Sequence, residues 1–208
     1  MNFEVLIGFT FATVVLAISP GPDNIFVMVQ SMANGKKYGL ATVAGLMTGC
    51  LVHTTLLAFG VSALIKENES LFFTIKLFGA VYLLFLSYKV FKSSPKIDFS
   101  QQSSPKKGLM NLFQTGFWMN VLNPKVTIFF LAFFPGFLFS ESLDTVVQFY
   151  VLGFLFIIVS SLVFGTIAIL AGSISNYVLK NPKSGLFLKW LQIIVFIAIA
   201  LYLLLSGK

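Results

Sequence analysis

The chain has 208 residues, of which 57% are apolar and only 10% charged, and its mean hydropathy is +0.93. This composition excludes a single soluble globule, and the apolar runs are too long for a soluble core, so we place the chain in a lipid bilayer. The net charge of +7 would suggest a nucleic-acid partner if the protein were soluble. Here the lysines fall between apolar runs, where they fix orientation in the membrane, and no nucleic-acid partner is expected.

The first residues and the cysteine content exclude further classes of protein. Glu4 stands where a signal peptide would carry positive charge, and no small-residue cleavage pattern follows it. The first apolar stretch is therefore expected to belong to the fold. Cys50 is the single cysteine, which excludes a disulfide framework and a cysteine-based metal cluster.

The first apolar segment, residues 3 to 33, is too long for one straight span, because a helix rises about 1.5 Å per residue and the hydrocarbon core is about 30 Å thick. It contains the sequence SPGPD, in which Pro20 and Pro22 are both candidates for a helix break. A proline is tolerated at the first position of a helix, and a preceding serine accepts a hydrogen bond from the new helix. The pattern predicts a broken helix that restarts at Ser19-Pro20, with a simple proline kink as the alternative.

The second and third predicted spans cover residues 38 to 65 and 71 to 91. In the second, Gly45 and Gly49 form a GxxxG pattern that permits close helix packing, by default within the bundle, or else across a homodimer. The polar stretch 92 to 107, rich in Ser, Pro, Gln and Lys, follows the third span and is predicted to be a linker.

His53 lies near the middle of the second span, with Cys50 three residues before it on the same helix face. Two ligands without a nearby carboxylate do not make a metal site, so neither a metal nor another cofactor is expected. His53 titrates near physiological pH and could accept a proton. A hydrogen-bonded histidine of the core is the alternative that we favour.

The second half of the chain repeats the organisation of the first. The fourth segment, residues 108 to 139, is again too long for a simple span, and Asn123-Pro124 predicts a break about half the chain length after the first one. The fifth and sixth predicted spans cover residues 145 to 172 and 185 to 206. Three spans per half is an odd number, so the second half must enter the membrane in the opposite sense.

The sequence therefore predicts an all-α polytopic membrane protein of six transmembrane helices, built as two inverted three-helix repeats. The repeats are residues 1–91 and 108–208, on either side of the linker 92–107. A short similarity between Ala80–Leu84 and Ala200–Leu204 adds weak support, since leucine-rich spans also match by chance.

Lysine counting predicts the orientation of the chain. The first, third and fifth loops hold Lys36, Lys37, Lys92, Lys96, Lys106, Lys107, Lys180 and Lys183. The opposite side holds Lys66 and Lys208 together with five acidic residues. Because lysine-rich loops remain in the cytoplasm, we expect the linker inside and both termini outside.

Two charges lie at the predicted breaks. Asp23 is the only one of the seven acidic residues expected at membrane depth, where a carboxylate marks either a function or a helix cap. Lys125 lies in the first turn of a helix, where the dipole disfavours a cation, so a function or snorkelling to the interface must explain it. Together the two would match the ammonium and the carboxylate of a zwitterion.

The sequence contains no arginine, so recognition of a carboxylate must use Lys125 and backbone N–H groups at the helix starts. The predicted substrate-binding residues are Asp23, Lys125, Ser19, Gly21, Asn24, Asn120 and Asn123. Gly21 would let the backbone approach a ligand closely, although a role as a turn residue is as well supported. Proton coupling is assigned to Asp23, with His53 as the second candidate. A site of near-zero net charge favours small neutral amino acids over lysine or arginine.

Three stretches carry a family resemblance: SPGPDNIFVMVQSMANGKKYGLATVAGLMTG (Ser19 to Gly49), the lysine-rich linker, and NPKVTIFFLAFFPGF (Asn123 to Phe137). They resemble the LysE/RhtB family of amino-acid exporters, and the similarity covers essentially the whole chain. The resemblance implies a plasma-membrane (inner-membrane) secondary exporter of amino acids or close derivatives, homoserine- or threonine-like under the charge argument above, and driven by the proton gradient. A passive channel, or an exporter of another small zwitterion or cation, is the alternative. An enzyme is not expected, because one carboxylate, one lysine and one histidine on three segments supply no catalytic set.

Overall fold

The computed structural model describes residues 2–19, 21–62, 69–94 and 108–205, and within these ranges the chain forms helices and no strand. The elements, in chain order, are α1 (Phe3–Ile18), α2 (Pro22–Asn34), α3 (Lys36–Leu56), the π-helix η1 (Leu57–Val61), α5 (Glu69–Lys92), α6 (Leu109–Val121), α7 (Pro124–Ile128), the π-helix η3 (Phe129–Phe133), the 3₁₀ helix η4 (Phe134–Phe137), α8 (Thr145–Ile169), α9 (Ala171–Lys180) and α10 (Pro182–Leu205). The all-α class predicted from the sequence is confirmed for the described residues.

Several helices have the length and composition of membrane spans. In the described ranges four qualify on their own: Lys36–Val61, Phe73–Lys92, Thr145–Ile169 and Lys183–Leu205. Two further pairs qualify together and are bent, α1 with α2 by 60° and α6 with α7 to η4 by 49°. The number of spans is therefore four, or six if each bent pair counts as one.

The first break is present, but the prediction that the new helix starts at Ser19-Pro20 is wrong. Ser19 is the C-cap of α1, and α2 begins at Pro22 with Gly21 as its N-cap, in an extended conformation (φ −160°, ψ 175°). The reason lies in the second proline, because a residue that precedes proline is disfavoured in the α conformation. Gly21 can therefore not continue a helix that starts before it. Pro20 lies outside the described residues.

The second break is confirmed where it was predicted. Asn123 is the N-cap of α7, and its side-chain oxygen accepts from the amide of Lys125 at 3.0 Å, with Pro124 in the first helical position. The predicted regular helix up to residue 139 does not form, because α7 widens into η3 and then tightens into η4. Pro135 has no N–H to donate to the preceding turn, so a regular α-helix cannot pass through it.

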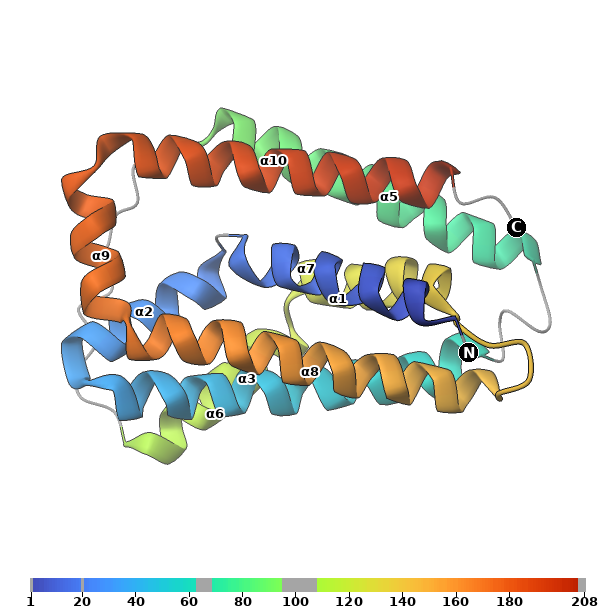
Figure 1. The fold of residues 1–208 in the computed structure, drawn as a ribbon, viewed down its shortest axis with the longest axis horizontal. Coiled ribbons are helices and arrows are strands. Elements are labelled where there is room, and N and C mark those ends of the chain that lie inside the picture. Colours follow the sequence, from blue (N-terminus) through green and yellow to red (C-terminus); the bar gives the residue numbers. More distant parts are fainter. Residues whose placement is uncertain (1, 20, 63–68, 95–107, 206–208) are drawn as a thin grey trace.

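Helix α9 (Ala171–Lys180) lies mostly where the sequence predicts a loop, at residues 173 to 184 between the fifth and sixth spans. Its sequence, AGSISNYVLK, mixes small and polar residues and lacks the apolar run of a span. It forms a short helix that runs across one end of the bundle and joins α8 to α10 (Figure 1).

Helices α3 and α6 pack so closely that only glycine fits at their points of contact. A Cβ at Gly45 would overlap the backbone carbonyl of Phe113, and one at Gly116 would overlap the carbonyl of Thr42. Gly49 lies against Asn120 in the same way, with a Cβ only 2.8 Å from its side chain. The GxxxG pattern therefore packs within the bundle, as the default interpretation had it, and it brings Asn120 close to α3.

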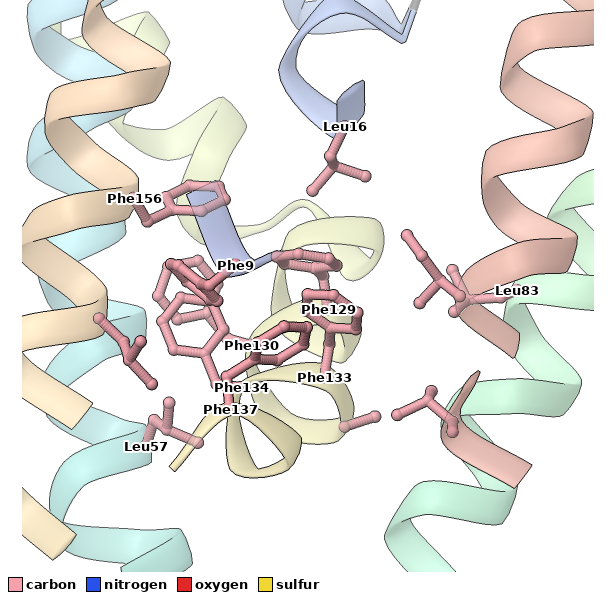
Figure 2. Close-up of a cluster of buried hydrophobic side chains, with 14 of the residues drawn as sticks. Phe9, Leu16, Leu57, Leu83, Phe129, Phe130, Phe133, Phe134, Phe137 and Phe156 are labelled. Carbon is pink, nitrogen blue, oxygen red and sulfur yellow. The ribbon is translucent and has the colours of Figure 1, made fainter. Parts of the chain in front are cut away.

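The interior of the bundle is built from phenylalanine. Phe9 of α1 contacts the edge of Phe134 at 4.9 Å between ring centroids, and Phe130 stacks on Phe134 at 4.1 Å. Figure 2 shows these rings gathered around η3 and η4, between α3 and α8 on one side and α5 and α10 on the other. This cluster holds the segment after the second break in the centre of the molecule.

The two ends of the bundle differ in what they contain. The start of α1, the end of α10 and the loop 138–144 lie at one end, where the amide of Asn2 donates to the carbonyl of Phe139 at 2.8 Å (Figure 1). The turn between α2 and α3 lies at the other end, beside α9. Gly35 makes this turn with a φ of 99°, a conformation that favours glycine.

Candidate functional site

The starts of α2 and α7 meet inside the bundle and are joined by a hydrogen bond. Asn123 Nδ2 donates to Asp23 Oδ2 at 3.0 Å, across 100 residues of sequence. The other end of the same amide, Oδ1, accepts from the backbone N–H of Lys125 at 3.0 Å. Because both ends of the Asn123 side chain are engaged, it holds the Asp23 carboxylate in a fixed place relative to the second break.

Asp23 and Lys125 are both partly buried, in the first turns of α2 and α7. The Lys125 ammonium lies 5.1 Å from the ring centroid of Phe196 and 3.8 Å from the position that a Cβ would take at Gly21. No ion pair within 4.0 Å joins it to Asp23, both residues being among those described. The two opposite charges are therefore neighbours that do not neutralise each other by direct contact.

The two charged side chains line one cavity. Its volume is about 50 Å³, which is room for a few water molecules and far below the 300 Å³ or more of typical ligand sites. Its polar lining is Asp23, Asn24, Asn120, Asn123, Lys125 and Ser160, and its apolar lining includes Leu16, Leu46, Met47, Phe129, Phe156 and Phe164. A solute larger than a few waters can enter only if the surrounding helices move apart.

Side chains also donate hydrogen bonds to backbone carbonyls at the ends of α1 and α6, next to the two breaks. Asn24 Nδ2 donates to the carbonyl of Ala17 at 2.8 Å, at the end of α1. His53 Nε2 lies 3.1 Å from the carbonyl of Asn120, at the end of α6, and since a carbonyl only accepts, this ring nitrogen is the donor. The Asn120 carbonyl also accepts from the backbone N–H of Asn123 at 3.0 Å. Because carbonyls freed by a break are costly away from water, both side-chain contacts stabilise the broken geometry.

The structure brings together most of the residues predicted for the site. Gly21, Asp23, Asn24, Asn120, Asn123 and Lys125 all line the cavity, and Pro22 lines it as well. Ser19 and His53 do not. Ser19 is fully buried at the end of α1, one position before the break, because the helix restarts later than expected.

No metal site accompanies this arrangement in the part of the chain that the structure describes, where no three His, Cys, Asp or Glu side chains gather. Cys50 contacts Asn120, which donates to its sulfur at 3.4 Å.

Comparison with known proteins identifies the family. The family model described as LysE type translocator matches residues 14–207. The homoserine/homoserine lactone efflux protein of Salmonella typhimurium is 30% identical over 184 residues, which is 88% of this chain and 87% of that protein. The chain belongs to the LysE type translocator family.

Two further relatives of this LysE-type translocator carry names that say only that they are membrane proteins. The uncharacterized membrane protein YrhP of Bacillus subtilis is 33% identical over 64% of this chain and 67% of its own length. An uncharacterized membrane protein of Vibrio cholerae is 25% identical over 88% of each chain. No solved structure matches.

In this LysE-type translocator the sequence reasoning missed three parts of the site. Ser160 lines the cavity from α8, Phe196 of α10 lies under the Lys125 ammonium, and Phe129 and Phe156 form an aromatic wall. Ser160 could have been noticed, since it interrupts the apolar run of its span. Nothing in the sequence singles out Phe196 among 25 phenylalanines.

Proposed function

We propose that the protein is a secondary active exporter of small neutral amino acids or close derivatives, and that the cavity between the two breaks is its substrate site. The observation that carries the proposal is the placement of Asp23 and Lys125 on one cavity without an ion pair between them. An amino acid carries one positive and one negative group, and could pair with both charges at once. The efflux of homoserine and its lactone named for the Salmonella relatives supports the same substrate class.

Each end of the substrate has a proposed partner. Asp23, held by Asn123, receives the ammonium group. Lys125 receives the carboxylate, together with backbone N–H groups at the start of α2, where the N-cap Gly21 has no side chain to accept from them. Without arginine in the chain, no bidentate clamp competes for this role.

The remaining predicted residues take supporting roles in this proposal. Asn24 and Asn120 contribute neutral hydrogen-bonding groups from the cavity wall. Ser19 lies off the cavity and would act only through the bend of α1 against α2.

Proton coupling is assigned to Asp23, the only carboxylate on the cavity among the residues that the structure describes. A carboxylate enclosed among apolar helices can alternate between a charged form that binds the ammonium group and a neutral form that releases it. His53 stays the second candidate. Its ring donates to the carbonyl of Asn120, so a change in its protonation would act through the position of α6.

The proposed architecture has six spans in two inverted repeats, 1–91 and 108–208, joined by a cytoplasmic linker at 92–107. The packing of corresponding elements supports it: α3 packs on α8, α5 packs on α10, and α1 packs on α8 as α6 packs on α3. Ala80 and Ala200, at equivalent positions of the short similarity, are both fully buried. With lysine-rich loops inside, both termini would face outward from the inner membrane.

A growth panel tests the proposal. Cells that overexpress the protein are exposed to inhibitory concentrations of threonine, homoserine and lysine, with cells that express Asp23→Asn as the control. We expect tolerance toward the small neutral amino acids in the native strain alone. An equal tolerance in the control, no tolerance at all, or a tolerance for lysine above threonine would contradict the proposed function.

A further inference from the structure

Two residues that line the cavity each carry a buried side-chain oxygen with no hydrogen-bond partner among the described residues. They are Ser160 Oγ and Asn120 Oδ1, on side chains that are only 1% and 4% exposed. Other buried groups in the same condition are Ser19 Oγ, Gln30 Nε2, Ser31 Oγ and Ser62 Oγ, none of which belongs to a cavity-lining residue. Buried polar groups nearly always have a partner, and these two belong to residues of the cavity, so they are available to a molecule that enters it.

The hydroxyl group of Ser160 differs in its hydrogen bonding from the hydroxyl groups of two buried threonines in the same bundle. Thr13 donates to the carbonyl of Phe9 and Thr54 to that of Cys50, both at 2.8 Å and both four residues back. Ser160 has the carbonyl of Phe156 at the same spacing, but makes no hydrogen bond to it. Its hydroxyl is therefore not used to satisfy its own helix.

The position of Ser160 separates it from the charged part of the site. It comes from α8, whereas Asp23 and Lys125 come from the starts of α2 and α7. Beside it on the wall are apolar side chains, among them Phe156 and Phe164. A substrate whose ammonium and carboxylate meet the two charges would direct its side chain toward the remaining wall.

We infer that Ser160, together with Asn120 Oδ1, is a specificity determinant that selects amino acids whose side chain bears a hydroxyl group; this rests on the proposed function. A hydroxyl donates and accepts, so it can pair with Asn120 Oδ1 and Ser160 Oγ at once. An apolar side chain of the same shape would leave both groups buried and unpaired. Sites built to bind a hydroxyl reject the analogue that lacks it more strongly than apolar pockets distinguish sizes.

Transport into inverted membrane vesicles tests the inference with two matched pairs of substrates, threonine against valine and homoserine against norvaline. In the native protein we expect the hydroxyl member of each pair to be preferred by about tenfold or more. Ser160→Ala should reduce this preference to about twofold or less, chiefly by loss of the hydroxyl substrates. Ser161→Ala is the matched control, because the neighbouring serine does not line the cavity, and it should retain the native preference.

The possible failures are distinguishable. If the native protein transports none of the four amino acids, the proposed function fails and the inference with it. If it transports them without a preference for the hydroxyl, or if Ser160→Ala keeps the preference, the inference fails and the exporter remains. Ser160→Cys, which preserves volume, serves as a second variant; loss of all four substrates in both variants would assign Ser160 a structural role and would also overturn the inference.

Discussion

The two helix breaks place opposite charges in equivalent positions, and local structure favours only one of them. At the first break Asp23 lies in the first turn of α2, where the helix dipole attracts an anion. At the second break Lys125 lies in the first turn of α7, where the same dipole repels a cation. The first charge is stabilised by its own helix, and the second only by what surrounds it.

The surroundings of Lys125 supply what its helix does not. Its ammonium lies over the buried ring of Phe196 and close to Gly21 of the opposite break. The two helix caps also differ. Asn123 caps α7 and also donates to Asp23, whereas Gly21, the N-cap of α2, has no capping side chain. Residues of the second break therefore contact residues of the first, and a substitution at either break should alter the structure of the other.

Removal of the acidic charge should have the largest effect. Asp23→Asn is expected to reduce export driven by an imposed pH difference to background, because no other carboxylate of the described part of the chain lines the cavity. Substrate exchange across the membrane should persist in part. Uptake of labelled substrate into vesicles, with and without a pH gradient, measures both. Asp144→Asn is the control, since Asp144 is exposed and an asparagine can also cap α8. Gradient-driven accumulation by Asp23→Asn would move proton coupling away from this residue.

The close packing of α3 on α6 predicts the next largest effect, which is on stability. Gly45→Ala should destabilise the protein by about 1–3 kcal/mol, because its Cβ would meet backbone of α6, which cannot yield as a side chain can. Gly8→Ala in α1 is the control, because a Cβ there would make only an ordinary contact with Phe137 at 3.8 Å. Melting temperatures in detergent compare the two. Equal shifts would contradict the close packing of α3 on α6.

Asn123 makes two hydrogen bonds, one that caps α7 and one to Asp23. Its substitution should have a smaller effect, and the loss of each bond can be measured separately. Asn123→Ala loses the cap of α7, which is worth about 1 kcal/mol, and also the bond to Asp23. Asn123→Ser restores the cap with a shorter side chain, so it should recover most of the melting temperature but not the transport rate. Recovery of both would show that the bond to Asp23 is dispensable.

The parts of this molecule that the sequence predicts are those fixed by local chemistry. The long apolar runs, Pro124 after its capping asparagine, and the packing of Gly45 each follow from one residue and its neighbours. The start of α2 was misplaced by two residues because two prolines compete, and the restriction on the residue before Pro22 decides between them. Phe196 and Ser160 could not be assigned to the site from the sequence, since only the packing of α10 and α8 brings them there.

The most direct test of a zwitterion site shared by the two breaks pairs Lys125 with the carboxylate of the substrate. Vesicle transport is measured for threonine and for its amide, in the native protein and in Lys125→Ala. Lys183→Ala is the control, because Lys183 is exposed and does not line the cavity. In the native protein and in the control, the amide should bind about 10- to 100-fold more weakly, the value of a charge-assisted hydrogen bond. In Lys125→Ala the two substrates should differ by no more than about threefold, because the partner of the carboxylate is already absent. The same ratio of threonine to amide in all three proteins would contradict the assignment of Lys125 to the substrate carboxylate.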